Sequence, residues 1–476
     1  MTKLITIDPV TRIEGHSKIT IRLDDDGRVD VARLHITQFR GFEKFTEGRP
    51  YQEMPSLTAR TCGICPISHL LASAKACDDL MAVTIPASAA MLRRVINFGQ
   101  LIQSHALSFF HLSSPDLLLG MDSDPASRHI LGVAAKFPEL AKDGIWLRKF
   151  GQQIIERLSG KRIHPTWIVP GGVSQPLSEA VRDQIVAEIP QAMAIARKTL
   201  DWFKPAIANF QDEIDSFANF PSLFLGLVSP DGAIEHYDGY MRVVDAQRRI
   251  VVDKIESRDY AKYIGEAVEP DSYLKSPYFK PLGYPAGLYR VGPLARLNVC
   301  ERMGTPLAEG ELADFRALQP EGAVLSSFHF HYARLVEILY ALERVAELLG
   351  SPEILSTQVR AIANPNKAEG VGISEAPRGT LIHNYRIDAN GLITWANLII
   401  ATGHNNLAMN QGITQVAKRF VDGRKIGEGA LNRVEAVIRC YDPCLSCSTH
   451  ALGEMPLRIE LLDASGEVLD SCERGL

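Results

Sequence analysis

Apolar residues recur at three- and four-residue spacing through much of the first half of the chain. Between residue 66 and about residue 220, this helical period runs through PISHLLASAKACDDLM, AAMLRRVINFGQLIQSHALSFFHL and PLSEAVRDQIVAEIPQAMAIARKTLDWFKPAIANF. We expect helices this apolar to be buried on more than one side, as in the middle of a bundle. A further long helix is predicted in SSFHFHYARLVEILYALERVAELLG, where Gly350 and Pro352 end it.

Other segments alternate apolar and polar residues around a turn. Residues 17–37 do so around an acidic Asp-Gly turn and residues 379–400 around Ala-Asn-Gly, so both predict β-hairpins. Residues 222–300 are richer in Gly, Pro and Tyr and contain strand-like runs such as MRVVDAQRRIVVDKI. Near the C-terminus, MPLRIELLDASGEVLDS alternates like a pair of strands.

These patterns predict an α+β fold that is predominantly α. We expect a central bundle of long helices, peripheral β-hairpins and a smaller mixed α/β lobe. No internal repeat or low-complexity linker divides the chain, so we treat it as a single unit. Within it we expect an N-terminal hairpin region, a helical core, the mixed lobe, a helix-and-hairpin region and a C-terminal extension, at 1–60, 61–221, 222–325, 326–450 and 451–476.

Composition narrows the class of protein. The chain has 476 residues, of which 46% are hydrophobic and 22% charged, and a core of this size needs no disulfides. A formal net charge of −5 argues against nucleic acid as a partner. The N-terminus shows no signal-peptide pattern, and no apolar run reaches the roughly 18 residues of a membrane helix. We therefore expect a cytoplasmic protein with no membrane span, although a protein can also be exported on its partner's signal.

Two Cys-x-x-Cys pairs stand near opposite ends of the chain. RTCGICPISH contains Cys62 and Cys65, and YDPCLSCSTH contains Cys444 and Cys447. A zinc ribbon keeps its two pairs roughly 15–20 residues apart, whereas here a whole domain must bring them together. Four thiolates suit zinc, iron–sulfur clusters, nickel or copper(I). The cysteine pairs alone favour structural zinc or a redox-active thiol pair.

Five segments resemble the signature series of nickel–iron hydrogenase large subunits. They follow the family's order across nearly the whole chain: DPVTRIEGH (8–16), FRGFEKF (39–45), RTCGICPISH (60–69), SEAPRGT (374–380) and DPCLSCSTH (442–450). GFEKFTEGRPYQEMP and ICPISHLLASAKACD are most similar to the cytoplasmic bidirectional, NAD-coupled group. The resemblance implies reversible cleavage of H2 into protons and electrons, together with the fold of that family's large subunit.

The resemblance also implies a ligand set. Cys62 and Cys444 match terminal nickel ligands, and Cys65 and Cys447 match the cysteines that bridge nickel to iron. The family's iron also holds cyanide and carbon monoxide, which this chain cannot supply, so maturation proteins are implied. A thiol with a low pKa is deprotonated and can bind metal, and a base close to the metals must take the proton from H2.

Four charged residues match family residues around the metals. Arg378, in EAPRG, matches an arginine over the open metal position; because it is always charged, orientation and electrostatic stabilisation are its expected roles. Asp116 and Asp442 match acids grouped near that guanidinium, and Glu14 matches the start of the proton exit path. Taken alone, these residues would be a surface arginine, a helix or turn residue, an Asp-Pro turn and a solvated charge.

A second cation is implied by the same resemblance. Glu43 and His450 match ligands of a structural cation, usually magnesium, completed by a backbone carbonyl close to Leu398. Magnesium prefers oxygen ligands and water, so a histidine ligand is atypical. Thr402 falls where the family has a hydroxyl that hydrogen-bonds an iron-bound cyanide. Membrane-bound and periplasmic members often have a proline where Ala401 stands.

Two further residues are candidates for supporting the ligands. His69 lies one turn beyond Cys65 if PISHLL begins a helix, which would let its ring hydrogen-bond a cysteine sulfur. Arg60 is a similar candidate. We expect the other histidines to belong to core or surface packing, among them His105, His111, His329 and His331.

Several cofactor signatures are absent from the sequence. Cys77, Cys300, Cys440 and Cys472 lack cluster spacing, and there is no ferredoxin-type run, G-x-G-x-x-G fingerprint or Walker A lysine loop. We therefore expect no iron–sulfur cluster, flavin or NAD on this chain. Electrons must then pass to a small hydrogenase subunit with iron–sulfur clusters, and onward to a flavin-bearing module with the NAD site.

The resemblance also implies that the C-terminal segment is removed during maturation. Family large subunits are commonly cut after the last motif residue, here His450, by a maturation protease once nickel has been inserted, which would remove residues 451–476. A hydrogen sensor, or a hydrogenase coupled to deazaflavin, heterodisulfide or NADP, would share the metal site. A structural component of the respiratory NADH–quinone complex is disfavoured, because that relative lacks the four cysteines.

Overall fold

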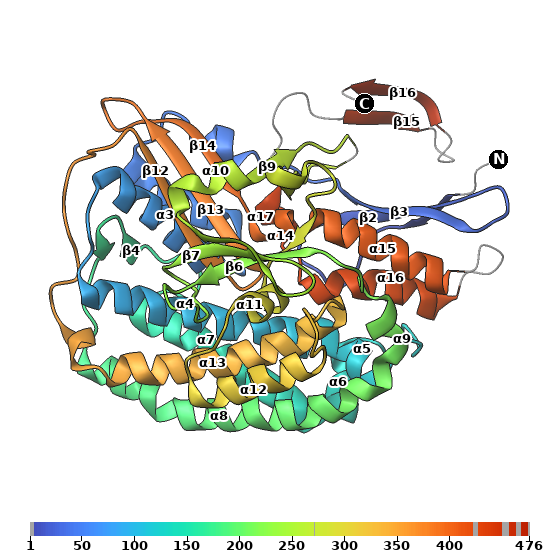
Figure 1. The fold of residues 1–476 in the computed structure, drawn as a ribbon, viewed down its shortest axis with the longest axis horizontal. Coiled ribbons are helices and arrows are strands. Elements are labelled where there is room, and N and C mark those ends of the chain that lie inside the picture. The colour runs from blue at the N-terminus through green and yellow to red at the C-terminus, as the bar shows by residue number, and fades with distance from the viewer. Residues whose placement is uncertain (1–3, 271, 422–426, 450–456, 463–467, 475–476) are drawn as a thin grey trace.

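The computed structural model describes residues 4–270, 272–421 and 427–449 in full, and the backbone of 457–462 and 468–474. Long helices pack side by side in the lower half of Figure 1 and form the main hydrophobic core. They are α4 (Ala87–Leu107), α7 (Pro138–Ser159), α8 (Glu179–Ala206), α12 (Pro306–Ala317) and α13 (Phe330–Gly350). None of the described helices is long and apolar enough to cross a membrane. The predicted fold class, predominantly α with a helical bundle, is confirmed.

Local chemistry sets where these helices begin, end and cross. The hydroxyl of Ser178 accepts a hydrogen bond from the Val181 backbone N–H and so caps α8. Helices α4 and α7 cross closely at Gly99 and Gly151, where a Cβ on Gly151 would lie 2.7 Å from the Gly99 carbonyl oxygen. Beyond α4 the chain makes a π-helical turn at Ser108–Ser113, which the sequence pattern did not predict.

Helix α3 (Pro66–Met81) matches the predicted segment and carries the first cysteine pair at its start. Pro66 occupies its first turn, where a missing N–H costs nothing, and Ala82 ends it in a left-handed conformation. The helix packs along β12. Its interior face is almost wholly buried, as expected from its apolar composition. Shorter helices α5 (Ser114–Leu119) and α6 (Ile130–Lys136) lie beyond the bundle's π-helical turn.

Both predicted hairpins are present, and each gains a third strand. The N-terminal sheet has the order β1 (Leu4–Ile7), β2 (Ser17–Leu23) and β3 (Val29–Ile36), and the second sheet has the order β12 (Glu369–Ala376), β13 (Gly379–Ile387) and β14 (Ile393–Ile399). All pairs in the two sheets are antiparallel. Arg378 stands in the tight turn between β12 and β13.

The middle of the chain forms the predicted mixed region. One sheet has the order β11-β6-β7-β8, with strands at Tyr289–Arg290, Leu223–Val228, Tyr240–Val244 and Ile250–Ile255. Strands β9 (Ile264–Ala267) and β10 (Ser276–Phe279) form a separate pair, and α11 (Pro293–Val299) packs against β6. A small ribbon of β4 (Ile168–Val169) and β5 (Gly172–Val173) was not predicted.

The outer edge of β3 is covered by side chains from other elements. The N–H groups of Ala32, Leu34 and Ile36 donate to the side-chain oxygens of Thr414, Asn410 and Ser272, at distances of 3.1, 2.9 and 3.2 Å. Thr414 and Asn410 lie on α15 (Asn406–Phe420). The N-terminal sheet is thereby fixed to the C-terminal part of the chain.

An N-terminal segment, at Glu14, meets the second cysteine pair. Helix α16 (Glu428–Tyr441) ends at Asp442, whose left-handed φ of 52° turns the chain into α17 (Leu445–Ser448). Glu14 and Cys444 form an isolated parallel β-bridge. The predicted C-terminal strand pair is present as β15 (Leu457–Leu462) and β16 (Val468–Arg474), set apart from the helical body in Figure 1.

Candidate metal centre

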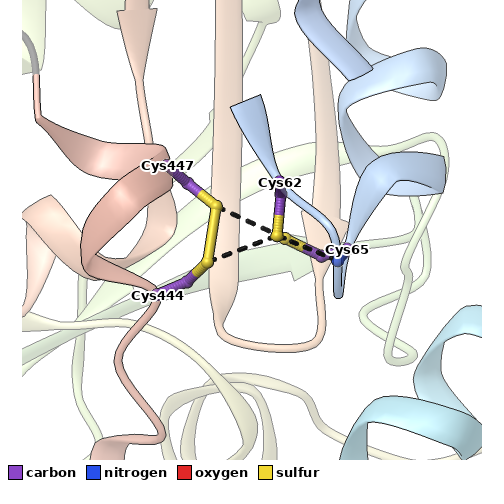
Figure 2. A group of neighbouring side chains, drawn as sticks. All are labelled: Cys62, Cys65, Cys444 and Cys447. Atoms are coloured by element: carbon purple, nitrogen blue, oxygen red, sulfur yellow. Dashed lines mark hydrogen bonds between the residues drawn. A yellow bond between two sulfur atoms is a disulfide. The ribbon is translucent and has the colours of Figure 1, made fainter. Parts of the chain in front are cut away.

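Four cysteine sulfurs converge in the interior, as Figure 2 shows. Cys65 stands at the N-cap position of α3 and Cys444 at that of α17, with no capping hydrogen bond from either side chain. The Cys62 sulfur lies 3.0 Å from that of Cys65 and 3.3 Å from that of Cys444, and the Cys65 and Cys447 sulfurs lie 3.8 Å apart. All four sulfurs lie within 4.8 Å of one another, and none of the residues is more than 5% exposed. The fold therefore brings both Cys-x-x-Cys pairs into one buried site.

The two sulfurs of the second pair, Cys444 and Cys447, lie in contact and are drawn joined in Figure 2, whereas Cys62 and Cys65 are free thiols. As thiolates, the four sulfurs offer one buried space a donor set that suits soft metals such as nickel and iron. Their role as metal ligands stays a prediction.

Cys62 and Cys65 also differ in their electrostatic surroundings. Burial raises the pKa of Cys62, but hydrogen bonds from the Cys65 thiol and N–H and the charge of Arg378 outweigh burial, so this pKa is lowered. The pKa of Cys65 is raised well above its ordinary value, by its hydrogen bond to Cys62 and by burial. Cys62 is therefore the thiol of the pair that ionises more readily.

Arg378 is buried close to the sulfurs and pairs with Asp442. Its NH2 group lies 3.0 Å from Asp442 Oδ2, its Nε donates to the Asp442 carbonyl, and its NH1 lies 3.4 Å from the Ser104 hydroxyl. Burial disfavours the charge on Arg378, but Asp442 and the two nearby thiols, Cys65 and Cys62, more than offset burial and raise its pKa. Arg378 therefore stays a cation beside the sulfurs.

Two residues hold the second cysteine segment in place. The Cys444 backbone N–H donates to the Thr402 hydroxyl at 2.9 Å. The half-buried carboxylate of Glu14 accepts a hydrogen bond from the Ser446 N–H at 3.0 Å, and the Glu14 carbonyl accepts one from the Leu445 N–H. Glu14 thus contacts Ser446, the residue that precedes Cys447 along the chain.

The comparisons with known proteins agree with this geometry. A family model described as nickel-dependent hydrogenase matches residues 40–126 and 235–450, and a second, HoxL-like model matches residues 4–39. The NAD-reducing hydrogenase HoxS subunit beta of Cupriavidus necator is 42% identical to the chain over the full length of both. The chain belongs to the nickel-dependent hydrogenase family.

A second relative and a solved structure are also similar to this chain. In Methanococcus voltae, one subunit of the vhc F420-non-reducing hydrogenase is also 42% identical, over 96% of each chain. A solved structure, an NAD+-reducing [NiFe]-hydrogenase in the H2-reduced state, superposes with a TM-score of 0.92 and 45% identity over 94% of this chain and 100% of that one. The family identification that the five sequence motifs suggested is therefore confirmed.

The hydrogenase also has a buried carboxylate where a second cation was predicted. Glu43, on α1 (Phe42–Phe45), accepts a hydrogen bond from the Leu398 N–H at 2.8 Å. The Lys275 ammonium lies 3.3 Å from Glu43 and 2.9 Å from Glu266. Lys275 is therefore a cation already in contact with the predicted ligand, a neighbour that the sequence did not reveal. His450, the other predicted side-chain ligand, lies outside the described residues.

His69 makes a contact that the sequence did not predict. Its Nδ1 lies 3.3 Å from the Nε2 of His383 on β13. His383 in turn contacts the Tyr385 hydroxyl at 2.5 Å, and that hydroxyl donates to Ser73 at 2.9 Å. All four side chains are buried, so the helix that follows the first cysteine pair is joined to β13 by a polar chain. A hydrogen bond from His69 to a cysteine sulfur stays a prediction.

Asp116 has charged partners that the sequence did not reveal, and Arg60 is corrected by the structure. Asp116 pairs with Arg12 at 2.6 Å, Arg439 at 3.0 Å and Arg128 at 3.8 Å, and its grouping near the Arg378 guanidinium stays a prediction. Asp442 is the acid that pairs with Arg378, as predicted. Arg60 is exposed to solvent and forms no hydrogen bond or ion pair among the described residues, so it does not support the ligands.

Three residues that the sequence did not single out hold the first cysteine loop. His164 lies 2.7 Å from the Cys62 carbonyl, and Gln100 and Gln103 both donate to the Ile64 carbonyl, at 2.8 and 2.7 Å. These contacts reach backbone atoms, so no pairing of side-chain types in the sequence signals them. Four of the histidines expected in core or surface packing, His105, His111, His329 and His331, are buried or half-buried. His105 pairs with Glu337 at 2.8 Å.

Proposed function

We propose that this chain is the catalytic subunit of a hydrogenase complex that cleaves H2 reversibly and passes the electrons, through an iron–sulfur partner subunit, to NAD+. The observation that carries the proposal is the convergence of four buried cysteine sulfurs beside the cation Arg378 and the carboxylate Glu14. When bound, a nickel–iron group with cyanide and carbon monoxide on the iron supplies the site at which H2 is polarised and split.

The chain would hold that group through the four thiolates of the site. We assign Cys62 and Cys444 as terminal ligands and Cys65 and Cys447 as bridging ligands. Thr402, whose hydroxyl accepts the Cys444 N–H, has its own O–H free to donate toward a cyanide ligand. The buried surroundings of the four cysteines strengthen charge interactions within the site.

Arg378 and Glu14 have different proposed roles when H2 is split into charged products. Arg378 stays charged and is aimed by Asp442, so it orients and stabilises rather than takes a proton. Glu14 is the carboxylate that contacts the residue next to Cys447 and is half-buried, so it can receive a proton and release it outward. We place the first step of the proton path at Glu14.

A magnesium ion is proposed beside Glu43, with the Leu398 carbonyl and His450 as further ligands. The buried carboxylate supports this assignment. Lys275 competes for the same oxygen, so a bound magnesium ion would have to coexist with its ammonium or displace it. The site would be structural, because it fixes α1 against β14.

Electron exit is proposed at the loop between the first two cysteines. Among the described residues, the four cysteines form the one group able to hold a metal through at least three His, Cys, Asp or Glu side chains. The described part of the chain therefore offers no second metal group of this kind to carry electrons away from the site. Gly63 and Arg60 are exposed although Cys62 is buried, which makes this loop a short route to the surface. We propose that the iron–sulfur subunit docks here, with a flavin-bearing NAD module beyond it, in the cytoplasm.

Maturation is part of the proposal. We propose that nickel-insertion proteins load the centre and that a protease then cuts after His450. The uncut segment would keep Cys444 and Cys447 accessible for metal. Intact-mass measurement of the active enzyme tests this, and an active complex that still carries residues 451–476 would exclude obligatory cleavage.

Metal analysis and infrared spectroscopy of the purified complex test the proposed function. We expect nickel and iron together with infrared bands of metal-bound cyanide and carbon monoxide. Stoichiometric zinc without such bands would refute it. The acceptor is tested separately by H2-dependent reduction of NAD+. The Methanococcus relative is as similar as the NAD-reducing one. A complex that reduces deazaflavin, a heterodisulfide or NADP but not NAD+ would keep the proposed metal site and refute the proposed acceptor.

A further inference from the structure

A second cluster of charges is buried next to the turn that carries Arg378. Its centre is Arg296 on α11, between Glu337 on α13 and Glu375 on β12, and all three side chains are fully buried. Arg296 Nε and NH2 each lie 2.6 Å from an oxygen of Glu337, and its NH1 lies 2.7 Å from Glu375 Oε2. The proposed reaction gives this cluster no role.

The remaining donors of Arg296 hold the backbone just before Arg378. NH1 donates to the Ala376 carbonyl at 3.0 Å, and NH2 donates to the Pro377 carbonyl at 3.2 Å. All five N–H groups of the guanidinium are therefore in use. Because the guanidinium is a rigid plane, its two carboxylate partners fix where these two carbonyls lie.

Other contacts fix the same turn in place on both sides. Glu375 accepts hydrogen bonds from the Thr380 hydroxyl at 2.7 Å and from the Leu227 N–H at 3.1 Å. At the start of α11, a Cβ on Gly292 would lie 2.7 Å from the Arg378 carbonyl oxygen, so the helix packs directly against the turn. The cluster thus surrounds the backbone of Arg378 without touching its guanidinium.

The cluster is also linked to the side chain of Arg378 through α4. His105 lies 2.8 Å from Glu337, and the residue before it, Ser104, is the hydroxyl at 3.4 Å from Arg378 NH1. Stability alone is a weak reason for such a cluster, because apolar side chains of similar size in place of a buried ion pair are often as stabilising. Accurate placement of a catalytic group is a stronger reason, since a displacement of about 1 Å can cost roughly a hundredfold in rate.

We infer that Arg296 is a positioning residue: it fixes the Ala376–Pro377 backbone and so aims Arg378 at the cysteine sulfurs. The inference rests on the proposed function and deepens it: the buried Arg296–Glu337–Glu375 cluster sets the position of the Arg378 guanidinium. A lysine at position 296 keeps the charge but has three donors in place of five, so the carbonyls of Ala376 and Pro377 lose their partners.

The test compares Arg296→Lys with Arg93→Lys in the complete complex. Arg93 is a matched control because it is also fully buried and also joins a carboxylate, Asp78, to two backbone carbonyls, those of Val169 and Gly172. The measurements are nickel and iron content, intensity of the infrared bands, melting temperature, and exchange between H2 and D2O per intact centre. The exchange reaction needs no electron acceptor, so it reports on H2 cleavage alone.

We expect both variants to melt at lower temperature, and the Arg296→Lys variant alone to lose at least about tenfold in exchange per intact centre. Exchange within about twofold of the unaltered complex would overturn the inference. If Arg296→Lys does not load metal, Glu375→Gln, which keeps the shape of the side chain, replaces it. We then expect a loss of several-fold per centre, and unchanged exchange would again overturn the inference.

A double substitution separates positioning from general stability. If Arg296 acts through Arg378, adding Arg296→Lys to an Arg378→Lys background lowers exchange per centre by less than twofold, because the group it aims is already gone. An equal fold-loss in both backgrounds would contradict the inference. Failure of the proposed function is distinct: an unaltered complex without nickel and iron, or without exchange, would refute that function before any variant is compared.

Discussion

The carboxylate of Glu14 accepts a hydrogen bond from the backbone N–H of Ser446 at 3.0 Å, although 432 positions separate the two residues. One contact therefore joins the first signature segment to the last. It also sets a carboxylate beside the residue that precedes Cys447, the cysteine that we assign as a bridge. Glu14 is therefore a candidate for two roles: holding the segment around Ser446 in place, and taking up a proton. An isosteric substitution can separate these roles.

Glu14→Gln should keep the centre and slow proton transfer. A glutamine oxygen can still accept the Ser446 N–H, but an amide cannot take up a proton at neutral pH. We expect nickel and iron to stay near their normal content, and exchange between H2 and D2O to fall on the order of 10²- to 10⁴-fold. Glu435→Gln is the control, because Glu435 also joins the two ends of the chain, through the Thr11 N–H at 2.9 Å. Equal exchange in both variants would remove Glu14 from the proton path.

Cys65→Ser should abolish metal assembly and activity together. An alkoxide is a far poorer ligand for nickel and iron than a thiolate, and the site cannot close with three sulfurs. We expect metal analysis to find neither nickel nor iron in stoichiometric amount. Cys300→Ser is the control, since Cys300 is equally buried and its pKa is raised to about 12 by burial, so it is a packing thiol. Normal activity in Cys65→Ser would contradict the ligand assignment.

Asp116→Asn should lower the melting temperature at neutral pH and lower it by less in acid. Burial alone would raise the pKa of Asp116, but Arg439 and Arg12 outweigh burial and lower it. A carboxylate with a lowered pKa in the folded state adds stability above its unfolded pKa of about 4, and this stability is lost as pH falls through the lowered value. Removing its charge takes away the carboxylate that pairs with Arg12 and leaves Arg439 with Glu435 alone, at a cost of up to about 3–5 kcal/mol.

Melting temperatures of the Asp116→Asn variant and the unaltered complex between pH 8 and pH 3 check this prediction. We expect a constant gap above about pH 5 that narrows below about pH 4. Asp122→Asn is the matched control, because its carboxylate also pairs with an arginine, Arg433, but is 72% exposed. Solvent screening limits such a pair to about 0–1 kcal/mol. A gap that does not change with pH would show that the charge of Asp116 is not what stabilises the fold.

Glu43→Gln should remove magnesium while the nickel–iron centre remains. The substitution takes away the carboxylate charge from the proposed magnesium site and one of the two anionic partners of Lys275. We expect magnesium to fall to background and the melting temperature to drop, with nickel content retained. In Glu266→Gln, which removes the other partner of Lys275, magnesium should stay bound. Magnesium at full content in Glu43→Gln would exclude Glu43 as its ligand.

Features that depend on local pattern were predictable from the sequence. The helix of Pro66–Met81 follows from its apolar period and its opening proline, and both hairpins follow from alternation around a turn. The cysteine pairs were recognisable because two short motifs carry their own spacing. Arg378 and Asp442 stand in motifs at the ends of β12 and α16, and they do meet.

Features that depend on which distant elements meet were not predictable. The ion pairs of Asp116 were not foreseen, because Arg12 and Arg439, its partners, come from distant parts of the chain. Lys275 near Glu43 and His164 at the Cys62 carbonyl arise from tertiary packing, and the second of these contacts a backbone atom. Neither leaves a pattern in the residues around it.

The bridge between Glu14 and Cys444 has a consequence for biosynthesis. At a translation rate of about 5–20 residues per second, the 382 positions between Cys62 and Cys444 take on the order of 20–75 s to synthesise. During that time Cys62 and Cys65 have left the ribosome without their partner cysteines, and the N-terminal segment has nothing to bridge. No four-sulfur site exists until the last part of the chain emerges. Loading of a four-sulfur centre must therefore wait until Cys447 has emerged, and a premature stop anywhere before Cys447 yields a chain that lacks part of the proposed ligand set.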